Sequence, residues 1–429
     1  MRTVFHGGQV FDATNHDIAD GDVAVEDGRI VEVGTGLDGD DEVDCAGATV
    51  LPGFIDCHVH FTVSGNLDPM HAVRTPFSLR FFEAARNMQA TLAAGITSIR
   101  EAGGSDLGIK VARDQGLIDG PRMTISITAL SQTGGHCDDW QVCGASVPTF
   151  GVPHPGLPDP IVDGPDQMRR KVRELVRAGA DVIKVCTSGG VLSPRDDPRH
   201  GHFRDAELSV LVEEAAAAGI WVMAHAQATD GIKAAVRNGI RSIEHGIYLD
   251  DEAIEMMLDR GTYLVPTLMA PRGVLEAADA GMAVPPEAVV KTKMVMEAHS
   301  ASISAAIAAG VNVAMGTDSG VTPHGRNLEE LALMVECGMT PERALVATTR
   351  TAAELLGVEA DVGTLEPGKL ADMVLVDGDP RQVDTLPDRI RAVYIGGRSI
   401  THQTQADVGD AAEAGVSRSL RAPLPRREG

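Results

Sequence analysis

The chain has 429 residues, 43% of them hydrophobic, and a formal net charge of −24. This length allows two or three domains, and the hydrophobic content excludes an intrinsically disordered chain. The negative charge argues against a basic nucleic-acid-binding surface and against attraction to anionic membranes. The six cysteines form no disulfide framework, and no apolar signal segment or membrane-spanning run is evident. We therefore expect a cytoplasmic protein with reduced thiols, which binds neither nucleic acid nor membrane.

Short apolar runs separated by turn residues dominate the start of the chain, over residues 3–50, and a similar pattern returns over residues 372–397. An Asp27-Gly28 pair between two of the runs is a hairpin signal. We expect residues 1–51 and 359–402 to form one small β-sandwich domain around a central insertion. The tail, residues 403–429, is polar and lacks periodicity, so we interpret it as a C-terminal extension of unassigned role.

Strand and helix patterns alternate between these two segments, over residues 52–358. The eight strand candidates are Gly53–His60, Ser98–Glu101, Met123–Thr128, Val182–Cys186, Trp221–His225, Ser242–His245, Tyr263–Thr267 and Asn312–Thr317. The clearest helices are expected at Asp166–Ala178, Ala206–Ala218, Asp250–Asp259 and Glu287–Ala309, and glycines 179, 219 and 310 provide stop signals. This alternation predicts an α/β fold, a (β/α)8 TIM barrel. The alternative is a doubly wound open sheet, but no Gly-x-Gly-x-x-Gly follows the first of these strands.

A histidine pair ends the first of these strands, in the run Gly53-Phe54-Ile55-Asp56-Cys57-His58-Val59-His60. Side chains alternate along a strand, so His58 and His60 point to the same face, roughly 6.6 Å apart along it. Imidazole is the commonest protein ligand of zinc-like metals. The pair alone is a weak signal, because histidines in strands are more often ordinary polar residues.

Four further ligand-type residues lie at the ends of other predicted strands, where barrel enzymes collect their chemistry. They are Lys184, His225, His245 and Asp318. Each has a plainer reading: His225 could be a core histidine, His245 a loop residue and Asp318 a helix N-cap. Lys184 is less ordinary, because a lysine in an apolar strand is costly to desolvate unless it is paired or modified. Taken together, the six residues predict a metal site.

These motifs resemble the amidohydrolase superfamily, and the resemblance extends from residue 3 to about residue 400. Its marks are Pro52 to His60, the strand-end His225 and His245, Gly316-Thr317-Asp318, and the segment from Gly363 to Asp372. The resemblance implies two divalent metal ions, with zinc as the first choice. His58, His60 and Asp318 would hold the buried ion, His225 and His245 the exposed one, and a carbamate on Lys184 would bridge both.

A lysine carbamate suits this position because an ammonium has no lone pair, whereas a carbamate offers two anionic oxygens. The expected reaction is attack by a metal-bridging hydroxide, since metal binding lowers the pKa of water to around 7. Asp318 would take the proton of this hydroxide and deliver it to the leaving amine. The exposed metal ion would polarise the substrate carbonyl.

Within the superfamily, the chain is most similar to Xaa-Pro dipeptidases and carboxypeptidases, some of which cleave ochratoxin-like amides. The marks are Thr133 to His136, Lys184 to Val191, and Glu244 to Tyr248. The resemblance implies that His136 and Tyr248 face the substrate, one polarising the carbonyl and the other holding a carboxylate. Each could equally be an ordinary loop or packing residue.

Arginines are natural partners of a substrate carboxylate, and Arg195, Arg199 and Arg204 lie on the long loop after the fourth barrel strand. We take Arg195 and Arg204 as substrate-binding candidates, although solvated loop charges are the commoner alternative. The same loop carries a second His-x-His, His200 and His202, which departs from the family pattern and bears on substrate size and charge.

We therefore expect a metal-dependent amidohydrolase that cleaves an amide bond beside a C-terminal amino-acid-like group, in a dipeptide, an N-acyl amino acid or a related small molecule. A homo-oligomer is implied by the resemblance. The alternatives are a mononuclear deaminase or cyclic-amide hydrolase on the same fold, and a non-catalytic scaffold. Lys184 argues against a deaminase, and the complete set of six residues argues against a scaffold.

Overall fold

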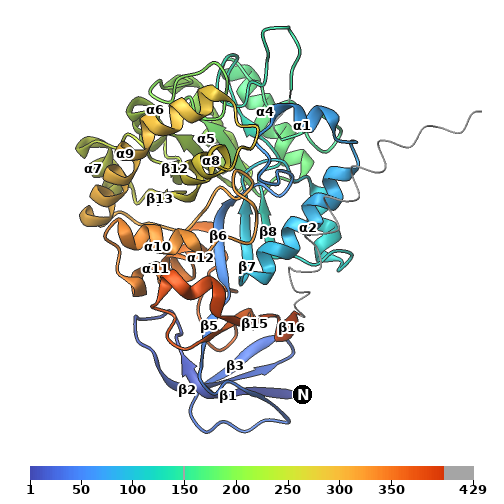
Figure 1. The fold of residues 1–429 in the computed structure, drawn as a ribbon, viewed down its shortest axis with the longest axis vertical. Coiled ribbons are helices and arrows are strands. Elements are labelled where there is room, and N and C mark those ends of the chain that lie inside the picture. The colour runs from blue at the N-terminus through green and yellow to red at the C-terminus, as the bar shows by residue number, and fades with distance from the viewer. Residues whose placement is uncertain (148–149, 401–429) are drawn as a thin grey trace, which may run out of the picture.

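The computed structural model describes residues 1–147 and 150–400 (Figure 1). The extension expected at residues 403–429, and the last two residues of the expected small domain, lie outside the described residues. Within the described part of the chain, no helix is long and apolar enough to cross a membrane.

Strands from both ends of the chain form one mixed sheet, which lies at the bottom of Figure 1 in blue and red. Its order is β16-β15-β14-β5-β1-β2-β3, with β4 paired to β1. The sequence predicted a small β-sandwich here. Hydrogen bonds join the strands into one connected sheet through β5, which pairs with both β14 and β1, and apolar side chains from both chain ends share one core. The bounds are β1 Arg2–Val10, β2 Ala19–Glu26, β3 Arg29–Gly34, β4 Asp41–Asp44, β5 Ala48–Pro52, β14 Met373–Asp377, β15 Ile390–Ile395 and β16 Arg398–Ile400.

Two parallel sheets occupy the middle of the chain. The first contains β6 (Phe54–Val59), β7 (Ile96–Glu101) and β8 (Arg122–Ile125). The second has the order β13-β12-β11-β10-β9, with β9 Ala129–Leu130, β10 Val182–Cys186, β11 Trp221–Ala226, β12 Ser242–His245 and β13 Tyr263–Val265. The third predicted strand, Met123–Thr128, therefore corresponds to β8 only at its start, and β9 begins just after its predicted end. The backbone turns at Ile127, whose φ of 69° no regular strand accommodates.

Hydrogen bonds outside the named strands connect the two parallel sheets at both edges. At one edge, Asp181 N donates to Ile125 O at 2.8 Å. At the other, Ala314 N donates to Leu264 O at 3.0 Å and Cys57 N donates to Met315 O at 2.9 Å. The eighth predicted strand, residues 312–317, thus lies between β13 and β6, but it forms only an isolated bridge with Leu264 and is not a regular strand.

Helices surround the parallel strands (Figure 1). They are α1 Pro69–Arg74, α2 Leu79–Ala93, α3 Leu107–Asp114, α4 Pro165–Ala178, α5 Asp205–Ala217, α6 Thr229–Arg237, α7 Asp251–Arg260, α8 Met269–Asp279, α9 Pro286–Ala309, α10 Glu329–Glu336, α11 Pro341–Ala347 and α12 Arg350–Leu356, with a 3-10 helix at Val383–Arg389. The four helices expected most clearly correspond to α4, α5, α7 and α9. Gly179 and Gly310 end α4 and α9 in the left-handed conformation, as the stop signals predicted.

Candidate metal centre

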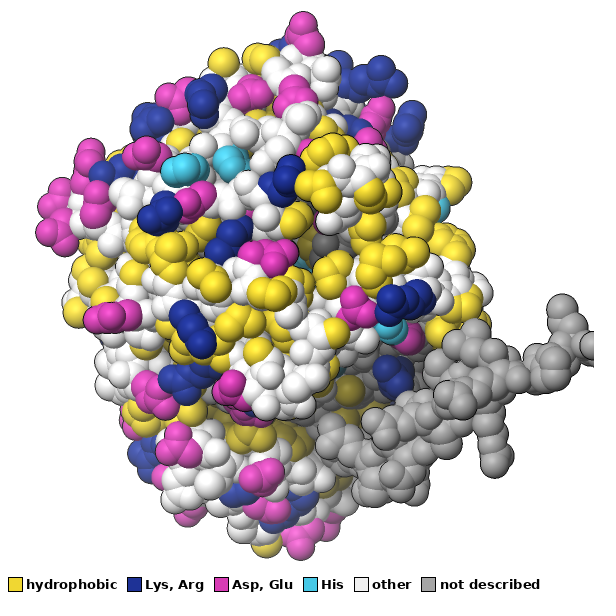
Figure 2. Space-filling view, turned by 45° about the horizontal axis from the view of Figure 1, so that its top comes forward, with side chains coloured by type: hydrophobic (Ala, Val, Ile, Leu, Met, Phe, Trp, Pro, Cys, Tyr) yellow, Lys and Arg dark blue, Asp and Glu magenta, His cyan; other side chains and the backbone are white. Residues whose placement is uncertain are grey.

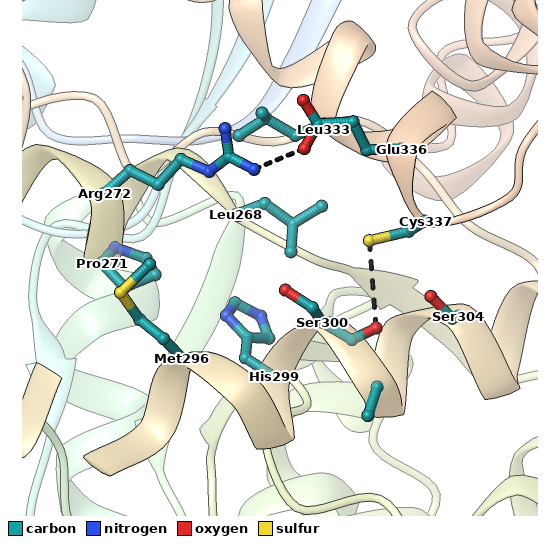
Figure 3. A pocket seen from close by; sticks show the side chains of 11 residues that line it. Leu268, Pro271, Arg272, Met296, His299, Ser300, Ser304, Leu333, Glu336 and Cys337 are labelled. Carbon is teal, nitrogen blue, oxygen red and sulfur yellow. Dashed lines mark hydrogen bonds and ion pairs between the residues drawn. The ribbon is translucent and has the colours of Figure 1, made fainter. Parts of the chain in front are cut away.

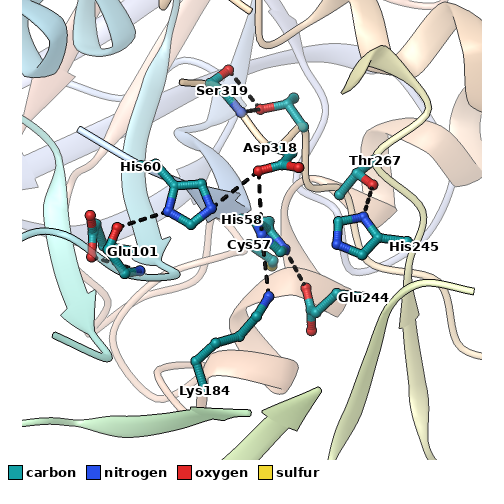
Figure 4. Close-up of polar contacts among 12 residues, drawn as sticks. Cys57, His58, His60, Glu101, Lys184, Glu244, His245, Thr267, Asp318 and Ser319 are labelled. Atoms are coloured by element: carbon teal, nitrogen blue, oxygen red, sulfur yellow. Dashed lines mark hydrogen bonds and ion pairs between the residues drawn. The ribbon is translucent and has the colours of Figure 1, made fainter. Parts of the chain in front are cut away.

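Three side chains at one end of the first parallel sheet converge on one point (Figure 4). His58 belongs to β6, His60 follows that strand, and Asp318 follows the segment that lies beside it. Asp318 Oδ1 lies 3.1 Å from His60 Nε2 and 3.6 Å from His58 Nε2. The ligand atoms of these residues all lie within 4.8 Å of one another, so the group could hold a metal ion.

The Nδ1 atoms of His58 and His60 each have a hydrogen-bond acceptor. His58 Nδ1 donates to the Glu244 carboxylate at 2.8 Å, and His60 Nδ1 donates to Gly103 O at 2.8 Å. Because a carboxylate and a carbonyl only accept, each proton sits on Nδ1 and each Nε2 keeps its lone pair. Backing acceptors of this kind are typical of metal-ligating histidines. The donor set therefore fits a divalent metal ion.

The other three predicted ligands lie beside this group. Lys184 Nζ is 3.4 Å from His58 Nε2, and the His245 ring centroid lies 5.2 Å from that of His58 and 4.6 Å from that of His225. His225 Nε2 donates to Gly189 O at 3.1 Å, which leaves the lone pair on Nδ1. All six residues predicted as metal ligands are thus brought together.

Burial governs the protonation of this cluster. Desolvation lowers the pKa of His58, His225 and His245 well below the usual histidine value, which favours the neutral form that ligates metals. Desolvation also lowers the pKa of Lys184. Burial opposes ionisation of Asp318, but the neighbouring histidines outweigh it and hold the pKa of this carboxyl below its usual value.

A buried ion pair supports the centre from below, and sequence reasoning missed it. Glu244 accepts from Arg100 at 2.7 Å, from Ser242 at 2.6 Å and from His58, and the Arg100 and Glu244 side chains are both 0% exposed. A possible signal was present, since Arg100 and Glu244 are charged residues inside apolar strands beside predicted ligands. Asp56 likewise accepts from Thr317 and Asn327, and burial raises its pKa to about 6.

A cavity of about 60 Å³ opens beside the cluster. Its polar lining includes His136, His225, Gln227, His245 and Asp318. The rest is mainly aliphatic, from Val191, Leu192, Ile247, Val274, Val295 and Val321. Figure 2 shows hydrophobic side chains gathered around a hollow on one face of the molecule. The cavity therefore presents polar groups at the candidate metal centre together with an apolar wall.

Of the predicted substrate residues, the structure brings His136 to this cavity. Its ring stacks on His225, with centroids 4.1 Å apart. Burial opposes charging of His136, but its contact with Asp196 prevails and raises its pKa. Tyr248 packs beside the aliphatic wall without lining the cavity.

The predicted arginines have other partners. The Arg195 guanidinium lies 5.3 Å from the Trp140 ring centroid, and Arg204 is the N-cap of α5, where it donates to Phe203 O. Neither arginine lines the cavity. His202 is buried, His200 is exposed, and neither lines the cavity.

A larger hollow of about 240 Å³ lies between α8, α9 and α10 (Figure 3). It is lined by Arg272 and Glu336, which pair across it, and by Cys337 and His299. His299 and Pro271 also line the smaller cavity, so this hollow adjoins the candidate centre from outside. His299 Nε2 lies within hydrogen-bond distance of the carbonyl oxygens of His245 and Pro266.

Residues 49–401 match the Amidohydrolase family model, and the chain belongs to this family. It is a hydrolase acting on carbon–nitrogen bonds, with a TIM-barrel-like α/β fold.

Among curated proteins, the chain is 36% identical over 365 residues to an ochratoxinase of Aspergillus niger, covering 81% of this chain and 75% of that protein. Among solved structures, it resembles a Xaa-Pro dipeptidase with bound methionine in its active site, with a TM-score of 0.87, 30% identity, and coverage of 94% of this chain and 100% of that one. A prolidase complexed with N-methylphosphonate-L-proline gives a TM-score of 0.86 and 34% identity at the same coverage.

Proposed function

We propose that this protein hydrolyses an amide bond beside a C-terminal amino-acid-like group, in a dipeptide, an N-acyl amino acid or a related small amide. The observation that carries the proposal is the convergence of the His58, His60 and Asp318 ligand atoms beside the cavity that His136 lines. The dipeptidase, prolidase and ochratoxinase relatives support the same substrate class. The aliphatic wall suits an apolar side chain on the substrate.

The proposal includes two divalent ions, with zinc as the first choice, because the donor set consists of four imidazoles, one carboxylate and the lysine carbamate. His58, His60 and Asp318 would hold one ion, His225 and His245 the other, and Lys184, as a carbamate, both. The ions would supply a Lewis acid for the carbonyl and lower the pKa of the attacking water. Carbamylation needs a neutral amine, and the lowered pKa of Lys184 favours that form.

The protein's own groups would carry out the remaining steps. Asp318 is ionised and faces the same point as His60, so it can accept a proton from the attacking water and pass it to the leaving amine. His136, which lines the cavity, would contact a substrate oxygen, and Tyr248 would help to bind the substrate. We also propose that residues 52–358 form a closed (β/α)8 barrel, which the edge hydrogen bonds of residues 125 and 312–315 support.

A combined substrate and metal assay tests this function. Protein reconstituted with zinc and bicarbonate is screened against N-acyl amino acids, dipeptides and ochratoxin, and its metal content is measured on the same sample. We expect hydrolysis with two ions per chain, and loss of turnover in His58→Ala and Asp318→Asn. Near-normal turnover by either variant would overturn the mechanism, and two-ion loading without any carbon dioxide source would exclude the carbamate.

A further inference from the structure

A buried carboxylate lies beneath the substrate-facing histidine and is not used by the proposed mechanism. Asp196 belongs to the loop between β10 and α5, and its side chain is 1% exposed. It accepts from Gly190 N at 2.9 Å and from the Ser193 hydroxyl, and its Oδ2 lies 3.5 Å from His136 Nδ1. A buried charge is costly unless it is paired and hydrogen-bonded, so this arrangement requires a counter-charge.

Lys291 of α9 supplies that counter-charge. Its Nζ donates to Asp196 at 3.0 Å, to Gly190 O at 3.0 Å and to Ser193 O at 2.8 Å. An ammonium has three protons, and all three have acceptors within the loop. Lys291 therefore has no proton left for a substrate, and it ties the loop of residues 190–196 to the long helix behind it.

Ser193 links this ion pair to the ring of His136. Besides His136, the Ser193 hydroxyl lies near the Asp196 carboxylate and Gly190 O. Both of these groups can only accept a hydrogen bond. The single hydroxyl proton must go to one of them. Ser193 Oγ, 2.7 Å from His136 Nδ1, therefore accepts from that nitrogen, and the His136 proton sits on Nδ1.

Packing holds the His136 ring in the orientation that its hydrogen bond to Ser193 requires. One face of His136 stacks on His225 at an interplanar angle of 18°. The ring also lies against Gly190, where a Cβ would stand 2.4 Å from Cε1 and Nδ1 of His136, so a larger residue at this position would displace the ring. With Nδ1 bound to Ser193, Nε2 is the ring nitrogen left for the cavity that His136 lines.

We propose that Ser193, Asp196 and Lys291 are positioning residues that hold His136 with Nδ1 protonated and Nε2 directed at the substrate. This inference rests on the proposed function for the role of His136 toward substrate, but its geometric part stands independently. The loop after β10 would thus set substrate binding through His136, whereas its arginines, Arg195 and Arg204, bind elsewhere on the protein.

Two variants and a matched control test the proposal in the zinc-loaded, full-length protein. Ser193→Ala removes the acceptor of Nδ1, and Asp196→Asn removes the charge that holds Ser193 and Lys291. Asp197→Asn is the control, because this neighbouring carboxylate pairs with Arg199 on the same loop. With N-acetyl-L-methionine as substrate, we expect KM to rise about tenfold in both variants with a smaller change in kcat, as for loss of one hydrogen bond.

The second readout needs no substrate. In protein labelled with 15N-histidine, a long-range 1H–15N spectrum reports which nitrogen of His136 is protonated, with His136→Gln supplying the assignment. We expect protonated Nδ1 in the wild type and in Asp197→Asn, and a mixture of tautomers in Ser193→Ala. A wild-type ring protonated on Nε2 alone, or a Ser193→Ala spectrum and KM equal to those of the control, would overturn the inference. If no amide is hydrolysed, the proposed function fails. The spectra still show whether Ser193 holds His136 with Nδ1 protonated.

Discussion

At the scale of single residues, Glu244 connects the fold to the candidate metal centre. It accepts the Nδ1 proton of His58 on one side and a guanidinium proton of Arg100 on the other, in a fully buried position. Arg100 also donates to Cys57 O of the ligand strand β6 at 2.8 Å. The orientation of His58 therefore depends on a charge pair between two different sheets.

We predict that Arg100→Met lowers the free energy of unfolding by about 3–5 kcal/mol, because it leaves the Glu244 charge buried without its partner. Zinc affinity should fall about tenfold or more as His58 loses its fixed acceptor. Urea denaturation of the metal-free protein and a zinc titration measure the two effects. Arg173→Met is the control and should change neither, because Arg173 is exposed and its partner Glu214 keeps a second arginine, Arg169. Equal denaturation curves for both variants would contradict the role of the buried pair.

The six ligand-type residues could be found from the sequence because each stands in or just after a predicted strand, and the alternation of side chains along strands brings His58 and His60 to the same face. Their supports could not be found in this way. Glu244 lies 186 positions from His58, and Lys291 lies 95 positions from Asp196. Such pairs depend on which strands and loops become neighbours in space, which a local pattern does not encode.

At the scale of elements, the helices were easier to predict than the strands at the sheet edges. Gly310 marks the end of α9 in the sequence. The break at Ile127 and the irregular segment 312–317 instead arise where the chain connects the two parallel sheets. The arginines of the loop after β10 show the same limit. Their spacing gave no sign that one would cap α5 and another would lie over Trp140.

The irregular segment 312–317 makes a close approach that depends on one glycine. A Cβ at Gly316 would stand 2.4 Å from Val265 Cγ1 and 3.1 Å from the Cβ of His58. We predict that Gly316→Ala costs about 1–3 kcal/mol of stability by overpacking, and weakens zinc binding by moving the ligand strand. Gly34→Ala, whose Cβ would meet only Leu37 at 3.5 Å, is the matched control. Calorimetric zinc titration of both variants checks this, and an unchanged affinity in Gly316→Ala would refute it.

At the scale of the whole molecule, a few polar contacts join the mixed sheet to the parallel strands. Arg122 of β8 binds Asp372, just before β14, through two hydrogen bonds of 2.6 and 3.0 Å. The same carboxylate accepts from Gly396 N at 2.8 Å, and Asp372 O accepts from Gly53 N at 2.8 Å. Asp372 thus holds the sheet against the start of the first ligand strand.

We predict that Asp372→Asn lowers the free energy of unfolding by about 1–3 kcal/mol, because a charge-assisted pair with a 1% exposed carboxylate is lost. Zinc affinity should stay at the wild-type value, since neither partner touches a candidate ligand. Asp377→Asn, at an exposed pair with Arg391, is the matched control and should leave the urea midpoint unchanged. If Asp372→Asn instead lost zinc binding while keeping its urea midpoint, the contact would act on the metal centre and would not serve to hold the two parts of the molecule together.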